Sequence, residues 1–435
     1  MSPSTIAIVG IVLLIGLFLL RMPVAYVMGL VGFVGFLYVS SGEGALRIIA
    51  RDFWAVFSSY SLTVVPMFVF MGAIAYSSGM SGRLYDTAYK YLGRFRGGLA
   101  LATIVACAGF GAMCGSTNAG AAAMGKVTLP EMRRYNYDPS LATACVAAAG
   151  SLAILIPPST VFIVYGILTQ ESIGKLFAAG IVPGLLLTAL FGITIVIICR
   201  INPRLAPAGE RFSWKERLTS LTGVIEMVLL FALVMGGLFV GWFTPTEAGA
   251  VGAAGAIIIA LVRRTLTWKG LLESLGDTTR ITAMVFLIIT CATVFGHFMS
   301  VTRTPFELSA WVGGLALPPV VIMSLIVLVY LIGGCFMDSL AMITVTIPIF
   351  YPLVLSLGYD SIWFGVIIVL VAEMGVITPP VGINVYVIKT VAPEVPLETI
   401  FKGIYPFLIA LIVCVAFLMI FPQIAIWLPS IMGSG

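Results

Sequence analysis

Two short polar stretches stand inside otherwise apolar sequence, and both carry side chains that could bind a cation. The first reads GFGAMCGSTNAGAAAMG (109–125) and contains Ser116, Thr117 and Asn118. Neutral oxygens of this kind, together with carbonyl groups at an interrupted helix, suit a hard monovalent cation such as Na⁺. Because glycine lets the backbone turn, we expect a re-entrant hairpin with its tip at 115–118. The alternative is a set of small residues that only lets helices pack closely.

The second polar stretch reads CFMDSLAMI (335–343), contains Asp338 and Ser339, and aligns with the first stretch as a second hairpin tip. A carboxylate within an apolar membrane segment is costly and usually functional. We therefore expect Asp338 at or beside a second cation site. Glu373 is the other deep carboxylate, and the residues leave two roles open for it: coupling to protons, or pairing within the helix bundle.

A helix-breaking signal follows each of these stretches. SLAILIPPST contains Pro157-Pro158, and EMGVITPPVG contains Pro379-Pro380. Proline removes a backbone N–H donor and clashes with the preceding turn. Inside a membrane a broken helix is tolerated where the freed groups are buried in protein or line a cavity. Two breaks at matched positions therefore indicate a binding site more than a pair of kinks in packed helices.

Motifs for other kinds of chemistry are absent from the sequence. It has no GxSxG, no HExxH and no P-loop, which disfavours an enzyme and an ATP-driven pump. It also has no TVGYG filter, which disfavours a channel. The seven cysteines show no CxxC spacing, so we interpret them as packing residues. His297 is the single histidine, and we expect a buried polar helix residue there. We predict no enzyme activity and no cofactor.

The helices that carry the two polar stretches and the Pro-Pro pairs are expected to lie in a membrane. The chain is 60% hydrophobic and only 9% charged, which is too little charge for the surface of a soluble protein. The apolar N-terminal stretch has no preceding basic residue, so we expect a membrane helix there and not a cleaved signal peptide. The net charge of +5 is modest and does not indicate nucleic-acid binding. About ten apolar stretches approach the length that spans a bilayer: 5–20, 24–40, 62–76, 176–199, 223–242, 246–262, 281–299, 320–334, 361–377 and 403–421.

The distribution of basic residues predicts the orientation of the chain. Lys and Arg are enriched in cytoplasmic loops. With the N-terminus on the outer side, most of the 23 basic residues fall in inner segments, among them Arg21 and the segments 79–97 and 263–280. Four basic residues fall on the outer side under this orientation: Arg47, Arg51, Lys175 and Arg303.

The sequence contains an internal repeat with a shift of 222 positions. Tyr137-Asp138 matches Tyr359-Asp360, and the first Pro-Pro pair matches the second. The connector 126–138 contains three basic residues, whereas its counterpart 348–360 contains none. By the charge rule the two connectors lie on opposite sides, so the repeats are inverted. Inverted repeats with broken helices are typical of secondary transporters, whose binding site lies at mid-membrane.

Four motifs together resemble the large membrane subunit of tripartite ATP-independent periplasmic (TRAP) transporters: GSTNAGAAAMG, ILIPPSTVFIVYG, GWFTPTEAGAVGA and GVITPPVGINVYV. The resemblance covers essentially the whole chain. It implies an all-α polytopic membrane protein with two re-entrant hairpins and two broken helices, in an elevator architecture like that of the ion transporter superfamily. It implies sodium-driven import of organic acid anions, such as dicarboxylates or sialic acids, across the bacterial inner membrane. The implied partners are a small four-helix membrane subunit and a periplasmic binding protein that delivers the substrate.

The resemblance also assigns roles to particular residues. Substrate contacts would come from the small polar residues after the breaks, namely Ser159, Thr160, Gly382 and Asn384. Apart from Lys126, no Lys or Arg falls near either tip, so an anionic substrate would rely on helix N-termini and on bound Na⁺. Leu340 stands where the second tip would match Asn118, which makes the two sodium sites unequal. The sodium sites would comprise Ser116, Thr117, Asn118, Gly150, Pro157, Asp338, Ser339, Gly375 and Pro379.

The repeat and the resemblance divide the chain into four segments. Residues 1–97 are expected to form scaffold helices and an amphipathic arm, and residues 201–302 further scaffold helices. Residues 98–200 form the first half of a transport domain, with a hairpin at 98–132 and a broken helix at 139–170. Residues 303–435 form the second half, with a hairpin at about 318–350, a broken helix at 361–390 and a C-terminal helix.

Two other functions are compatible with parts of this pattern. A self-sufficient sodium/dicarboxylate symporter of similar fold would need no binding protein. An intramembrane enzyme or a channel is the third possibility, but the missing catalytic motifs and the inverted repeat count against it.

Overall fold

The computed structural model describes residues 3–20, 22–40, 42–315 and 317–432. These residues form helices joined by short connections, together with one isolated bridge between Arg96 and Ala208. Arg21, which we expect on the cytoplasmic side, lies outside the described residues. Each of the ten apolar stretches falls on a helix. Five helices are long and apolar enough to cross a membrane alone, and two bent helix pairs raise that number to seven.

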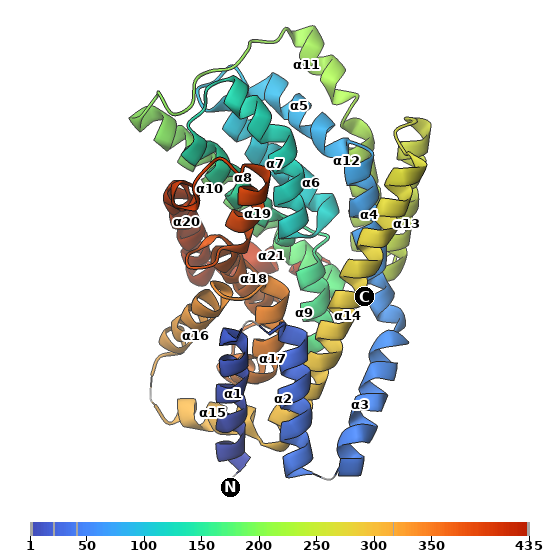
Figure 1. Cartoon of the computed structure of the whole chain (residues 1–435), viewed down its shortest axis with the longest axis vertical. Coiled ribbons are helices and arrows are strands. Elements are labelled where there is room, and N and C mark those ends of the chain that lie inside the picture. The colour runs from blue at the N-terminus through green and yellow to red at the C-terminus, as the bar shows by residue number, and fades with distance from the viewer. Residues whose placement is uncertain (1–2, 21, 41, 316, 433–435) are drawn as a thin grey trace.

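The first group of helices contains the long helix α14, which packs against α2, α3 and α4 of the same group (Figure 1). In this group α13 also packs against α4 and α12. The 3₁₀ turn η1 (Tyr60–Thr63) precedes α4, and α3 and α4 meet at an angle of 55° and are together long and apolar enough to cross a membrane. The members of the group are α1 (Pro3–Leu19), α2 (Val24–Val39), α3 (Gly42–Phe57), α4 (Val64–Ser77), α12 (Ile225–Val240), α13 (Pro245–Val262) and α14 (Trp268–Val301).

The second group contains the two polar stretches and both Pro-Pro pairs. It is built from two similar runs of helices, in which α8 packs against α7 and α20, and α18 packs against α16, α17 and α20. The first run is α6 (Gly98–Cys114), α7 (Thr117–Arg134), α8 (Pro139–Ser151), η2 (Leu152–Ile154), α9 (Thr160–Thr169) and α10 (Ile173–Ile201). The second run is α16 (Pro319–Gly334), α17 (Ser339–Ser356), α18 (Ser361–Ile377), α19 (Ile383–Val391), α20 (Leu397–Ile420) and α21 (Gln423–Ile431).

Matched residues begin matched helices in these two runs. The Asp138 carboxylate accepts the backbone amide of Ser140 at 2.9 Å and starts α8. The Asp360 carboxylate accepts the amide of Trp363 at 2.8 Å and starts α18. An acidic N-cap satisfies amides that would otherwise be unpaired at the start of a helix. The connectors are shorter than the sequence predicts, because α7 continues through Arg134 and α17 through Ser356.

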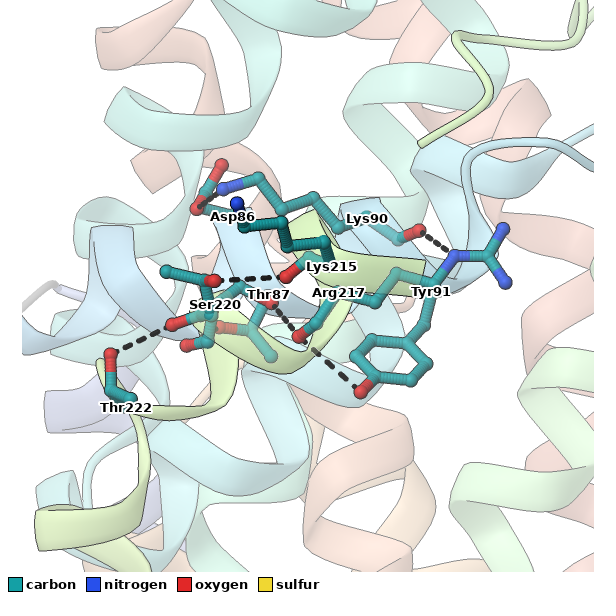
Figure 2. A network of polar contacts seen from close by, with 9 residues as sticks. Asp86, Thr87, Lys90, Tyr91, Lys215, Arg217, Ser220 and Thr222 are labelled. Carbon is teal, nitrogen blue, oxygen red and sulfur yellow. Dashed lines mark hydrogen bonds and ion pairs between the residues drawn. The ribbon is translucent and has the colours of Figure 1, made fainter. Parts of the chain in front are cut away.

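Short amphipathic helices lie at one end of the molecule, where α5 (Met80–Leu92) leads from α4 to α6 (Figure 1). Helix α11 (Trp214–Leu221) docks onto α5 through polar contacts, as Figure 2 shows. The Arg217 Nε donates to the carbonyl of Lys90 at 3.1 Å, and the Thr87 hydroxyl donates to the carbonyl of Ser220 at 2.9 Å. At the other end of the molecule, α15 (Thr304–Gly313) lies near the N-terminus.

His297 does not match the expectation of a buried polar residue. Its side chain in α14 is 31% exposed, and its Nε2 lies 3.0 Å from the Oδ2 of Asp52 in α3. The Asp52 side chain is only 4% exposed, and the Nε of Arg51 lies 3.6 Å from its Oδ1. This pair joins two helices of the first group. The cysteines do match their expected packing role, because six are buried and Cys114 is partly buried.

Candidate functional site

The first tip is formed where α6 ends and α7 begins. Gly115 has a φ of +61°, a backbone conformation that suits glycine. A β-carbon on Gly115 would lie 2.7 Å from the carbonyl oxygen of Pro158, so glycine also permits this close approach. The Thr160 hydroxyl donates to the carbonyl of Gly115 at 2.9 Å. The first tip therefore touches the first helix break directly.

The first break separates α8 and η2 from α9, and the peptide bond between Pro157 and Pro158 is cis. Ser159 is fully buried and begins α9 by accepting the amide of Phe162 at 3.3 Å. Gly150 lies against α7, where its β-carbon would be only 2.8 Å from the Cα of Ala121. The hairpin and the broken helix thus pack backbone against backbone, which small residues make feasible.

The second tip lies between α16 and α17. The Asp338 carboxylate starts α17 and accepts the amide of Leu340 at 3.1 Å. The Ser339 hydroxyl is buried and has no hydrogen-bond partner among the described residues. A β-carbon on Gly375 would lie 2.4 Å from the carbonyl carbon of Gly334, so this hairpin also packs tightly on its broken helix. An oxygen without a partner beside a carboxylate is a group that a bound cation could satisfy.

The second break separates α18 from α19 around the cis bond between Pro379 and Pro380. Gly382 precedes α19 with a φ of +60°. Asn384 is fully buried, and its amide donates to the carbonyl of Ala147 in α8 at 3.1 Å. The second break is therefore tied to the broken helix of the first repeat.

A cavity of about 1040 Å³ brings the two tips together. Its other walls are the start of α2, the end of α4 and the middle of α14, so it lies between the two groups of helices. Seven of the predicted site residues do not line it: Gly150, Pro157, Ser159, Gly375, Pro379, Gly382 and Asn384. Six of the predicted site residues do line it: Ser116, Thr117, Asn118, Thr160, Asp338 and Ser339.

One expectation about the charge of this site is wrong. Lys126 is not the only basic residue near the tips, because Arg280 lines the same cavity from α14. The charge pattern predicts Arg280 at the end of the cytoplasmic segment 263–280, whereas α14 begins at Trp268 and carries Arg280 along the cavity wall. Asp277 of α14 lines the cavity too. The helix was missed there because its first turns are polar.

Glu373 lies in α18 and is completely buried. Neither of its carboxylate oxygens has a hydrogen-bond partner among the described residues, and no ion pair involves it there. The structure thus provides no partner for the pairing role that the sequence left open. Of two other acidic residues in apolar surroundings, Glu226 pairs with Arg263 at 2.7 Å and Glu247 caps α13 with Thr244. Both of these are structural contacts.

Comparison with known proteins identifies relatives along the whole chain. The family model described as "Tripartite ATP-independent periplasmic transporter, DctM component" matches residues 11–424. A C4-dicarboxylate TRAP transporter large permease protein of Pseudomonas aeruginosa is 36% identical over 90% of this chain and 91% of its own length. A sialic acid TRAP transporter large permease protein of Vibrio cholerae is 32% identical over 97% of this chain and 98% of its own length.

A solved structure also resembles the fold of this chain. The YdaH transporter of Alcanivorax borkumensis superposes with a TM-score of 0.63 at 16% sequence identity, and the match covers 89% of each chain. At this level of identity the similarity concerns the fold. The overall fold is therefore shared by two chains with few sequence identities.

Proposed function

This chain belongs to the DctM component family of tripartite ATP-independent periplasmic transporters, and from that premise we propose that it imports organic acid anions with a sodium gradient. It is a membrane permease component and not an enzyme. Relatives named for a C4-dicarboxylate and for sialic acid both concern carboxylates, which supports the substrate class. The observation that carries the proposal is that both hairpin tips line one cavity between two groups of helices.

Sodium coupling is supported by the donor atoms at the two tips. Ser116, Thr117 and Asn118 offer neutral oxygens in the first tip, and Thr160 holds that tip against the first break. In the second tip, the Asp338 carboxylate stands beside the unpartnered hydroxyl of Ser339. Such oxygens suit Na⁺. Gly150, Pro157, Gly375 and Pro379 would contribute by placing the broken backbone against the tips, with carbonyl groups as the remaining ligands.

We propose that the second group of helices moves as a transport domain past the first group, which stays fixed as a scaffold. The segments 98–200 and 303–435 would form the moving part, and 1–97 and 201–302 the fixed part. The tight glycine contacts of each hairpin with its broken helix support joint movement of these elements. The cavity lies between the two groups, where the second group would move relative to the first.

The proposed orientation of the chain determines the side of the membrane toward which the cavity faces. With the N-terminus in the periplasm, the basic segment that contains α5 lies in the cytoplasm. The cavity is lined by the end of α4, which leads directly into α5, and also by the middle of α14 and the start of α2. This structure would then represent an inward-facing state, from which substrate leaves into the cytoplasm of the bacterial cell.

Two partners complete the proposed system. The word tripartite in the family description implies two further components. We propose that these are a small four-helix membrane subunit and a periplasmic binding protein that hands over the substrate. Thr160 is the predicted substrate residue that lines the cavity, whereas Ser159, Gly382 and Asn384 would reach substrate only in another state of the cycle.

The experiment that tests sodium coupling compares uptake as a function of sodium concentration for three variants. Asn118→Ala and Asp338→Asn should each raise the sodium concentration for half-maximal uptake by about tenfold, or abolish uptake, because each removes an oxygen ligand. Asn202→Ala is the control, since Asn202 caps a helix outside the cavity. A sodium dependence that is unchanged in both tip variants would reject this assignment of the sites.

A further inference from the structure

Two cationic side chains face one cavity from the two different groups of helices. Lys126 belongs to α7 of the second group of helices, and Arg280 belongs to α14 of the first group. Both residues are exposed and line the cavity that contains the two tips. Among the described residues, neither side chain takes part in a salt bridge or a side-chain hydrogen bond. These two charges are therefore available to a ligand.

The unpaired side chains of Lys126 and Arg280 on the cavity wall suggest a role in binding an anion. Both side chains lie on the wall of a cavity that also contains the two tips, and basic residues that face such a cavity in a transporter mark the path of ions or substrates. The guanidinium of Arg280 can hold a carboxylate through two parallel hydrogen bonds, and the ammonium of Lys126 adds a point charge. The pair thus matches an anion with at least one carboxylate group.

Two carboxylates line the same cavity, and neither cancels this pair. Asp338 is engaged as the N-cap of α17 and is also a proposed ligand of Na⁺. Asp277 lies one turn before Arg280 in α14, but no ion pair joins it to Arg280 or Lys126 in the described chain. Asp277 therefore weakens the positive potential in the cavity but does not neutralise either cation by an ion pair. Removing its negative charge should have the opposite effect to removing the charge of Lys126 or Arg280.

We propose that Lys126 and Arg280 form an exit site that binds the carboxylate of the substrate after it leaves the hairpin tips. This inference rests on the proposed function. One member of the pair would move with the hairpins and the other would stay with the scaffold, so the site is complete only in the arrangement seen here. An anion-binding site that forms in the inward-facing state draws the anion away from the tips and toward the cytoplasm.

A charge-selective labelling experiment tests this site in the large subunit bound to its small subunit. Ala283→Cys places a thiol on the cavity wall one turn after Arg280. Cys114→Ala removes the native thiol that lines the cavity, and the other native cysteines are buried. The labelling rate is measured with methanethiosulfonates that carry a sulfonate, a trimethylammonium or a neutral methyl group.

The expected readout is the ratio of the sulfonate rate to the trimethylammonium rate. Arg280→Gln and Lys126→Gln should each lower this ratio by about threefold or more, because a unit charge acts over a few ångströms with little screening. Asp277→Asn should raise it. Lys269→Gln, which removes a charge from α14 outside the cavity, should leave it unchanged. Equal rates with the neutral reagent confirm that the fold and the access are intact.

Succinate serves as the anionic probe for binding itself. It should slow labelling of the introduced thiol in the parent Ala283→Cys protein and lose that effect when Arg280→Gln is added. The exit site is wrong if the charge ratio stays the same in both cation variants, or if succinate protects the Arg280→Gln variant as well as the parent. Labelling needs no transport, so a failure of sodium-driven uptake would reject the proposed function while leaving the anion site in place.

Discussion

Thr160, the first residue of α9, donates its hydroxyl hydrogen to the carbonyl oxygen of Gly115, the turn residue of the first hairpin, at 2.9 Å. This bond links the broken helix to the hairpin tip across 45 residues of sequence. It also fixes the direction of a carbonyl group beside three side chains that could bind Na⁺. The hairpin and the break therefore form one unit, and a substitution in the broken helix should alter sodium binding at the hairpin tip.

Thr160→Val tests this unit, because it keeps the shape of the side chain and removes the donor. We expect a loss of about 1 kcal/mol in stability and a several-fold weaker dependence on sodium. Thermal unfolding and uptake against sodium concentration measure the two effects. Thr169→Val is the matched control, since Thr169 also lies in α9 but donates to its own helix at the Tyr165 carbonyl. Equal behaviour of the two variants would contradict the linkage.

Gly375→Ala tests the close packing of the second hairpin on its broken helix. The new β-carbon would meet the backbone of Gly334 at 2.4 Å, so α16 and α18 must move apart. We expect a loss of about 1–3 kcal/mol, seen as a lower midpoint of thermal unfolding in detergent. Gly276→Ala in α14, where nothing lies within 4 Å, should keep or raise the midpoint, because alanine favours a helix more than glycine does. A midpoint of the Gly375→Ala variant that stays at or above that of the parent would contradict the close packing.

The contact between Asp52 and His297 predicts a measurable coupling within the scaffold. A double-mutant cycle with Asp52→Asn and His297→Gln should give a coupling energy of about 1–2 kcal/mol, because the carboxylate is buried and the imidazole is partly exposed. The exposed pair of Arg47 and Glu43 on the same helix should give at most about 0.5 kcal/mol. Additive effects at Asp52 and His297 would show that the two groups stabilise the fold independently.

Arg217→Ala should loosen α11 from α5 (Figure 2). Arg217 is 7% exposed and donates to the Lys90 carbonyl, so its loss removes the bond and leaves that carbonyl unpaired. We expect amide hydrogen exchange in 214–221 to rise about fivefold, which corresponds to about 1 kcal/mol. Lys215→Ala, on the exposed side of the same helix, should leave exchange unchanged. A similar rise in both variants would locate the docking energy elsewhere.

Much of the fold could be predicted from the sequence because the decisive signals are local. Glycine at 115, the two Pro-Pro pairs and long apolar runs determine backbone path and burial without knowledge of tertiary contacts. Helices end and begin at Gly115 and around the two Pro-Pro pairs, where these residues predict an interruption of the helix. The apolar stretches likewise fall on helices, although several of those helices are too short to span a membrane alone.

Arg280 and Asp52 could not be placed in the same way. Helix α14 begins well before its apolar stretch, at Trp268, because a polar face toward the cavity is compatible with a helix. Asp52 lies in an amphipathic helix whose partner comes from α14, more than 240 residues later in the chain. Contacts of this kind depend on how two helices rotate against each other, and periodicity within one helix does not reveal it.

Uptake into liposomes tests the central claim most directly. The chain is reconstituted with its small membrane subunit, and the binding protein loaded with its organic acid is added outside, with or without an inward sodium gradient. We predict uptake only when both the gradient and the binding protein are present. Uptake that persists in potassium buffer with a proton gradient would contradict sodium coupling, and sodium-driven uptake without the binding protein would favour a self-sufficient symporter.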